Sequence, residues 1–287
     1  MSTRTKALVA VVALVAAFGA AGSASASTVL PYPPGTNDFS CKPPASHPRP
    51  VVLLEGLGGN SDAWRVFAPQ LKARGYCLFT INYGEHQLLK LFPYAVEGVV
   101  PMEQSAVELA AFVQKILTAT GASKVDIVGH SEGTVMPRWY LERLGGAAYV
   151  QKFIALTPLW RGSDVHGLVT LGEELKPYGL SQPVFGLIAG MCAACSEVLA
   201  GSDYLKNLNA DGEAVPGIEH TNIVTRYDEL VTPYTSGIMR DGGTNIVLQD
   251  VCPNDFSEHL AVAFDPNVLQ LIQNALDPAH ATPVVCS

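Results

Sequence analysis

The sequence is poor in basic residues. It has 18 lysines and arginines against 26 aspartates and glutamates, and its formal net charge at pH 7 is −8. Nucleic acids bind proteins mainly through lysine and arginine, so this composition excludes a nucleic-acid-binding protein. It also excludes attachment to anionic lipid by charge, so any transient contact with a lipid interface is expected to be hydrophobic.

Long apolar runs are missing after the first residues of the chain. A membrane-spanning helix needs roughly 20 apolar residues, and no later stretch reaches that length, so no membrane span is expected. At the N-terminus, Arg4 and Lys6 precede the uncharged run Ala7 to Gly22, and Ala24-Ser25-Ala26 follows. This order is typical of a secretory signal peptide, residues 1–26, and predicts a secreted protein. A membrane anchor is the alternative, and the short run with its cleavage site counts against it.

No internal repeat and no domain linker is visible in residues 27–287. Removing 26 of the 287 residues leaves 261, enough for one large α/β domain, and we expect a monomer. Removing Arg4 and Lys6 leaves 16 basic residues against 26 acidic ones, a net charge of −10.

Six cysteines in an exported chain indicate disulfides, although six cysteines allow 15 connectivities. Their placement at strand ends and at the tail favours three pairs, which are Cys41–Cys77, Cys192–Cys195 and Cys252–Cys286. The alternative for Cys192-x-x-Cys195 is a redox or zinc motif. A second C-x-x-C is missing, which disfavours that alternative.

Apolar runs and helical periodicity alternate along the chain. Strands are expected at 50–55, 77–82, 124–128, 153–156, 220–225 and 244–249, and helices at 64–74, 100–120, 134–144, 257–264 and 268–275. This alternation predicts an α/β fold with a mostly parallel central sheet and helices on both faces.

Two connections, 83–101 and 160–209, are unusually long. The second is rich in apolar residues, which argues against disorder. Two interpretations remain open for it: a helix pair that completes the core, or a cap or lid over an active site that receives an apolar substrate.

A catalytic serine is indicated by Gly129-His130-Ser131-Glu132-Gly133, which follows a predicted strand and precedes a predicted helix. A serine on such a sharp turn projects its hydroxyl above the sheet, and the helix N-terminus faces any oxyanion formed there. The alternative is an ordinary glycine-rich turn.

A serine hydroxyl needs a histidine as its base, and that histidine needs a carboxylate. The expected chain order in this fold class is serine, acid, histidine. We predict His259, which follows the last strand, in preference to His220 and His280. We predict Asp228, which follows the strand before it, in preference to its rivals Glu229 and Asp211.

The negative charge of the transition state requires two backbone N–H donors. One is expected from Glu132, which follows the serine, and the other from Leu57 in the glycine-rich loop after the first strand. No metal or organic cofactor is required for this chemistry.

The chain resembles secreted bacterial class 2 triacylglycerol lipases and esterases of the α/β-hydrolase superfamily, of the type common in actinobacteria. The resemblance runs from about Cys41 to Cys286. It rests on 51–60, on Gly129–Gly133 with Met136-Pro137-Arg138, on 225–228 and on Glu258-His259. It implies Ser131, Asp228 and His259 as the triad and Leu57 and Glu132 as the oxyanion hole. The family often has His-Gly before the oxyanion residue, where this chain has Glu55-Gly56.

Together these patterns predict a secreted serine hydrolase of carboxylic esters, with triacylglycerols or other fatty acyl esters as substrates. An extracellular acyltransferase, a polyester hydrolase or a peptidase would use the same triad. A non-catalytic hydrolase-like binding protein would be expected to lack a triad residue, and none is missing.

Overall fold

A parallel sheet forms the centre of the computed structural model, which describes residues 32–86, 96–167, 169, 190 and 192–287. Its strands in the described residues are β1 (Val51–Leu54), β2 (Leu78–Thr80), β3 (Val125–His130), β4 (Val150–Leu156), β5 (Glu219–Val224) and β6 (Thr244–Val247). They lie in the order β2-β1-β3-β4-β5-β6, and every neighbouring pair is parallel. This agrees with the predicted α/β class.

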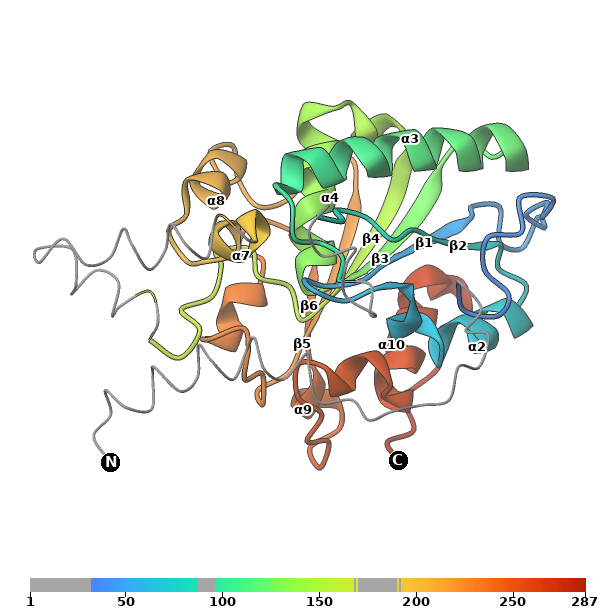
Figure 1. The fold of residues 1–287 in the computed structure, drawn as a ribbon. Coiled ribbons are helices and arrows are strands. Elements are labelled where there is room, and N and C mark those ends of the chain that lie inside the picture. Colours follow the sequence, from blue (N-terminus) through green and yellow to red (C-terminus); the bar gives the residue numbers. More distant parts are fainter. Residues whose placement is uncertain (1–31, 87–95, 168, 170–189, 191) are drawn as a thin grey trace, which may run out of the picture.

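Helices cover both faces of this sheet (Figure 1). The α-helices of the described residues are α2 (Phe67–Ala73), α3 (Met102–Thr120), α4 (Glu132–Arg143), α7 (Ala193–Glu197), α8 (Asp203–Leu208), α9 (Leu248–Val251) and α10 (Pro266–Leu276). Short 3₁₀ helices are η1 (Ser61–Trp64), η3 (Gly146–Ala148), η5 (Tyr234–Gly237), η6 (Ala261–Ala263) and η7 (Pro278–His280). Among these described helices, none combines the length and the apolar character that a membrane crossing demands.

The two faces are built by the alternation of side chains along each strand. On β1, Val52 and Leu54 belong to the core under α3 and α4, whereas Val51 and Leu53 belong to the core under α2 and α10. All four side chains are fully buried. A strand that is buried on both faces must be apolar throughout, which explains the continuous apolar run in the sequence.

Most predicted elements occur with boundaries shifted by a few residues, and two differ in kind. The helix predicted at 64–74 is instead the 3₁₀ helix η1 followed by α2. Asn60 caps η1 by accepting a hydrogen bond from the Asp62 N–H at 2.9 Å. This capping places Trp64, which is fully buried, in the core before α2 begins.

The helix predicted at 257–264 is wrong, because only η6 (Ala261–Ala263) forms there. Side chains bind two backbone N–H groups of this segment. The Ser257 N–H donates to Asp255 Oδ1 at 2.9 Å, and the His259 N–H donates to Glu229 Oε2 at 2.9 Å. These contacts hold the segment before η6 as a loop.

The long connection 160–209 is described only in part. Its described end carries α7 and α8, whose Ala194, Leu205 and Leu208 join the core under α3 and α4. This described part agrees with the interpretation of a helix pair that completes the core. Of the apolar residues that distinguish this connection, Val169 is described, and eight lie outside the described residues: Leu168, Leu171, Leu180, Val184, Phe185, Leu187, Ile188 and Met191.

Three disulfides join Cys41 to Cys77, Cys192 to Cys195 and Cys252 to Cys286. These are the pairs that the sequence placement favours. The third ties the C-terminal tail to the end of α9, and its two cysteines are 34 residues apart. The second closes a turn of only 3 residues at the start of α7.

We predict that the tail disulfide stabilises the fold more than the short one. Loop-closure entropy gives about 4 kcal/mol for a 34-residue loop and about 2 kcal/mol for a 3-residue loop. Cys252→Ser/Cys286→Ser should therefore lower the free energy of unfolding in urea more than Cys192→Ser/Cys195→Ser does. The reverse order would contradict an entropic role for the tail bridge.

Candidate functional site

The predicted site residues gather at one edge of the sheet. Parallel strands direct their carboxyl ends to a common edge, and the loops after β1, β3, β5 and β6 carry Leu57, Ser131, Asp228 and His259. β1 and β3 are neighbours in the sheet. From β1 the chain continues to β2 on one side, and from β3 it continues to β4 on the other side. A crevice forms where such a reversal occurs, and ligands of open α/β sheets bind there.

Ser131 lies on a strained turn between β3 and α4. Its φ of 56° and ψ of −122° fall in a region that non-glycine residues rarely adopt, at a cost of about 1–3 kcal/mol. Hydrogen bonds from the Ser131 N–H to Leu156 O at 3.0 Å and from the Thr134 N–H to Ser131 O at 2.9 Å fix the turn. Ser131 is partly exposed at this turn.

Two glycines make this turn sterically allowed. A Cβ on Gly129 would stand 1.9 Å from Gly133 O, and a Cβ on Gly133 would stand 2.4 Å from Glu55 O. The elbow thus packs backbone against backbone, both within the motif and against the end of β1. Only glycine fits at these two positions.

The ring of His259 is held by Asp228. His259 Nδ1 lies 2.9 Å from Asp228 Oδ1 and 3.0 Å from Oδ2, and both side chains are 2% exposed. Asp228 Oδ1 also accepts the N–H groups of Leu230 at 3.1 Å and Val231 at 2.7 Å. These contacts fix the orientation of the imidazole and leave Nε2 on its other side.

Glu229, the nearest rival of Asp228, contacts the same histidine differently. Its carboxylate accepts the backbone N–H of His259 and so positions the loop, not the ring. The other rival acid, Asp211, lies 3.9 Å from Arg143 at the surface, with an 86% exposed side chain. Neither geometry supports the ring of a catalytic histidine.

The alternative histidines lie elsewhere. His220 is buried, and its Nε2 accepts the Val215 N–H at 3.1 Å. Burial lowers the pKa of His220 to about 4. His280 is exposed in the tail and pairs with Asp277. His220 is therefore a neutral structural residue, and His280 a surface one.

His130 is a site residue that the sequence analysis did not assign. Its Nε2 lies 2.9 Å from the carbonyl oxygen of His259, and the two rings are 4.9 Å apart between centroids. Burial, and secondarily the charge of His259, lowers the pKa of His130 to about 3. The residue before the serine thus ties the elbow to the loop of His259 as a neutral hydrogen-bond donor. Its position inside the G-x-S-x-G motif was the available signal.

Ser131 and His259 are joined through His130 and not by a direct hydrogen bond. Within the described part of the chain, Ser131 Oγ and His259 Nε2 make no mutual hydrogen bond. Such contacts are often long in a free enzyme and tighten with substrate. The loop of Leu57 passes beside the serine, because a Cβ on Gly56 would stand 2.7 Å from Ser131 Cβ.

Large apolar side chains are exposed around the loops of Asp228 and His259. Tyr227 is 43% exposed and packs against Phe256, with ring centroids 5.2 Å apart. Phe256 is 64% exposed and Leu260 is 60% exposed. This apolar rim flanks the two residues that would act on the serine.

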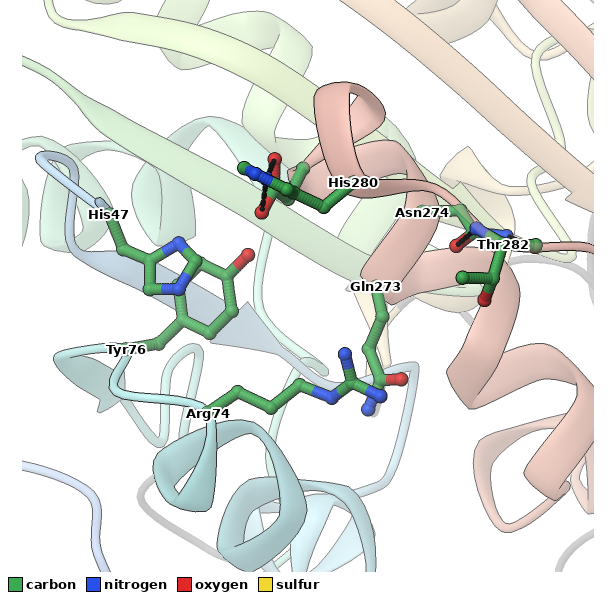
Figure 2. A pocket seen from close by; sticks show the side chains of 8 residues that line it. His47, Arg74, Tyr76, Gln273, Asn274, His280 and Thr282 are labelled. Atoms are coloured by element: carbon green, nitrogen blue, oxygen red, sulfur yellow. Dashed lines mark hydrogen bonds and ion pairs between the residues drawn. The ribbon is translucent and has the colours of Figure 1, made fainter.

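A polar hollow of about 290 Å³ lies elsewhere, at the opposite edge of the sheet. Residues that precede β1 and β2 line it together with the end of α10, and Figure 2 shows the His47 ring against Tyr76. Arg74 and Thr282 on its rim are exposed. This hollow is separate from the serine edge.

Comparison with known families agrees with this arrangement. The model of the class 2 lipases matches residues 48–271. The chain belongs to the class 2 lipase family. Triacylglycerol lipases of Pseudarthrobacter phenanthrenivorans and Burkholderia plantarii are each 28% identical to it over 144 residues, or 47% of the chain. The matched segments span only 40% and 36% of those two relatives.

Solved lipase structures share the α/β-hydrolase fold of this class 2 lipase. Aspergillus fumigatus lipase B superposes with a TM-score of 0.62 at 17% identity, covering 92% of this chain and 64% of that one. A Bacillus licheniformis lipase in its mature form superposes with a TM-score of 0.57 at 16% identity, covering 85% and 95%. At these identities the likeness establishes the fold.

Asp228 and Glu229 make different contacts with His259, so their substitution is expected to have different effects on turnover. Asp228→Asn should lower kcat by about 10⁴-fold, because an amide cannot hold the required tautomer of His259. Glu229→Gln keeps an oxygen acceptor for the His259 N–H and should lower kcat far less. Steady-state hydrolysis of a short p-nitrophenyl ester measures both. Equal losses would contradict the assignment of Asp228 as the acid.

Proposed function

We propose that this chain is a secreted serine hydrolase that cleaves carboxylic esters of fatty acids through Ser131, His259 and Asp228. The observation that carries the proposal is the Asp228–His259 pair, on the same sheet edge as the strained serine turn. A buried aspartate that orients an imidazole beside an elbow serine is the arrangement that acyl transfer needs. Membership of the class 2 lipase family supports ester bonds as the target.

Acylation begins at Ser131 Oγ. His259 Nε2 removes the hydroxyl proton as Oγ attacks the ester carbonyl carbon, and Asp228 stabilises the imidazolium that forms. The tetrahedral intermediate carries its negative charge on the former carbonyl oxygen. Its collapse breaks the bond to the alcohol oxygen, which takes the proton from Nε2.

Oxyanion stabilisation comes from two backbone N–H groups. Glu132 is the first residue of α4, so its N–H and the helix dipole face the developing charge. Leu57 supplies the second donor from the loop beside Ser131. Water then attacks the acyl-enzyme with the same assistance from His259, and the fatty acid leaves.

An apolar acyl substrate is supported by the rim around the site. The exposed Tyr227, Phe256 and Leu260 would lie against lipid while the ester reaches Ser131. The net negative charge disfavours an electrostatic attachment, so burial of these side chains supplies the affinity. Triacylglycerols fit this surface, and triacylglycerol lipase is the description of two relatives.

Secretion and a single catalytic domain complete the proposal. Three disulfides fit an oxidising compartment, and residues 1–26 have the composition of a signal peptide. Residues 27–287 then form one monomeric α/β-hydrolase domain, with 160–209 as its cap or lid region.

Ser131→Ala should abolish ester hydrolysis. Loss of the nucleophile costs roughly 10⁶ in turnover in a serine hydrolase, since the other triad members have nothing to activate. The measurement is p-nitrophenyl ester hydrolysis, with circular dichroism and the melting temperature as controls for folding. Near-wild-type turnover in a folded variant would contradict a mechanism in which Ser131 is the nucleophile.

Phe256→Ser and Leu260→Ser should weaken adsorption to lipid. Full burial of such a side chain contributes about 1.5–3 kcal/mol, so each substitution should lower the rate on a triglyceride emulsion about tenfold at limiting enzyme. Hydrolysis of a soluble acetate ester should change little. Val107→Ser is the matched control, because Val107 is 57% exposed but lies on α3. Equal losses on both substrates would contradict a role in lipid contact.

A further inference from the structure

Two fully buried glutamates flank the two proposed oxyanion donors. Glu132 carries one donor itself, and Glu55 directly follows β1, two residues before Leu57. Both glutamates are 0% exposed. Among the described residues, none of their four carboxyl oxygens has a hydrogen-bond partner. An ionised carboxylate in such a place would be very costly.

The backbone around these carboxyls is tightly joined. The Gly58 N–H donates to Glu97 O at 2.9 Å, and the Glu97 N–H donates to Gly59 O at 3.2 Å. Gly98 has a φ of +67°, and a Cβ there would stand 2.8 Å from Glu132 Oε2. The segment at Glu97–Gly98 therefore holds the oxyanion loop on one side and touches the Glu132 carboxyl on the other.

The groups that face the two carboxyls are acidic or phenolic. Burial raises the pKa of Glu55 well above its ordinary 4.5, and Glu97 raises it further. Burial also raises the pKa of Glu132 well above 4.5, with further upward effects from Glu55 and from Glu197 on α7. Burial without a hydrogen-bond partner thus favours the protonated form of each carboxyl.

Two buried tyrosines complete the surroundings. The Tyr83 hydroxyl donates to Glu55 O at 2.6 Å, so it does not serve the carboxyl. Burial, with further effects from Glu132 and other acidic neighbours, raises the pKa values of Tyr83 and Tyr204, so both stay neutral. A protonated carboxyl has an O–H donor as well as an acceptor, which a carboxylate lacks. Two neighbouring protonated carboxyls can thus donate hydrogen bonds to each other.

We propose that Glu55 and Glu132 share protons as a pair of neutral carboxylic acids, and that this contact locks the oxyanion loop to the nucleophile elbow. Both are positioning residues, since they act through the N–H groups of Leu57 and Glu132. The positioning role rests on the proposed esterase function, whereas the proton-sharing pair does not. At high pH both carboxyls lose their protons. Repulsion between the two carboxylates then separates the oxyanion loop from the nucleophile elbow.

The pH dependence of stability follows from the direction of the shifts. The folded chain holds these protons more tightly than the unfolded chain, whose glutamates titrate near 4.5. The contribution to stability is therefore complete below about pH 4.5 and is lost as pH rises through the folded pKa values. The alkaline limb of kcat should fall in the same range.

The test compares Glu55→Gln/Glu132→Gln, which keeps donors and acceptors without ionising, with Glu132→Leu, which removes them. Glu219→Gln, an exposed residue at the far end of β5, is the control. Infrared spectroscopy of the wild type at pH 7 should show the C=O band of buried protonated carboxyls, and the glutamine pair should lack it. Melting temperature against pH should fall less steeply for the glutamine pair than for the wild type.

Turnover of a soluble ester gives the second readout. Glu132→Leu should lower kcat at least tenfold with little change in KM, because a displaced oxyanion donor affects the transition state alone. The glutamine pair cannot ionise at these two positions, so its kcat, compared with its own value at pH 7, should lose the alkaline decline. Both wild type and control should keep that decline.

The two proposals fail in different ways. Absence of the protonated-carboxyl band in the wild type would overturn the carboxyl pair even if esters are hydrolysed. An alkaline decline unchanged in the glutamine pair would overturn its role in positioning. Absence of hydrolysis in a wild type that shows the band would instead overturn the esterase proposal and with it the positioning role, leaving the pair in place.

Discussion

The backbone turn at Ser131 is the constraint on which the rest of the site depends. It joins a buried strand to a helix within one residue, and the positive φ of Ser131 costs free energy that surrounding contacts must offset. Those contacts are backbone against backbone: Gly129 against Gly133, and Gly133 against the carbonyl oxygen of Glu55. The elbow is thus stable only where β1, β3 and α4 meet, which is why Ser131 and the loop of Leu57 lie side by side.

Buried polar groups at this edge fall into two chemically distinct sets. Asp228 accepts two backbone N–H groups and the ring of His259, so an anion there is compensated. The carboxyl oxygens of Glu55 and Glu132 have no hydrogen-bond partner among the described residues, and burial raises the pKa of both groups well above 4.5. Neutral His130 lies between the elbow and His259.

The features of the fold and the site that the sequence predicts are those that depend on residues close together in the chain. The elbow, the strands and the order of Ser131, Asp228 and His259 leave local signals, because glycine spacing and apolar runs directly reflect backbone geometry. The loop found in place of the helix predicted at 257–264 is fixed in part by Glu229, 30 residues away, which accepts the His259 N–H. His130 and the Glu55–Glu132 neighbourhood likewise depend on contacts between distant segments. Polar residues beside a motif give no indication of burial until the strands are assembled.

The described part of the 160–209 connection is tied to this same acidic neighbourhood. Glu197, at the end of α7, accepts the Met102 N–H at 2.8 Å and so caps α3 from a separate segment. Burial raises the pKa of Glu197 to about 7, and its charge also raises the pKa of Glu132. Ionisation of Glu197 strengthens its bond to a helix N-terminus but makes ionisation of Glu132 still less favourable. The charge that fastens α7 to the core therefore favours the protonated form of Glu132.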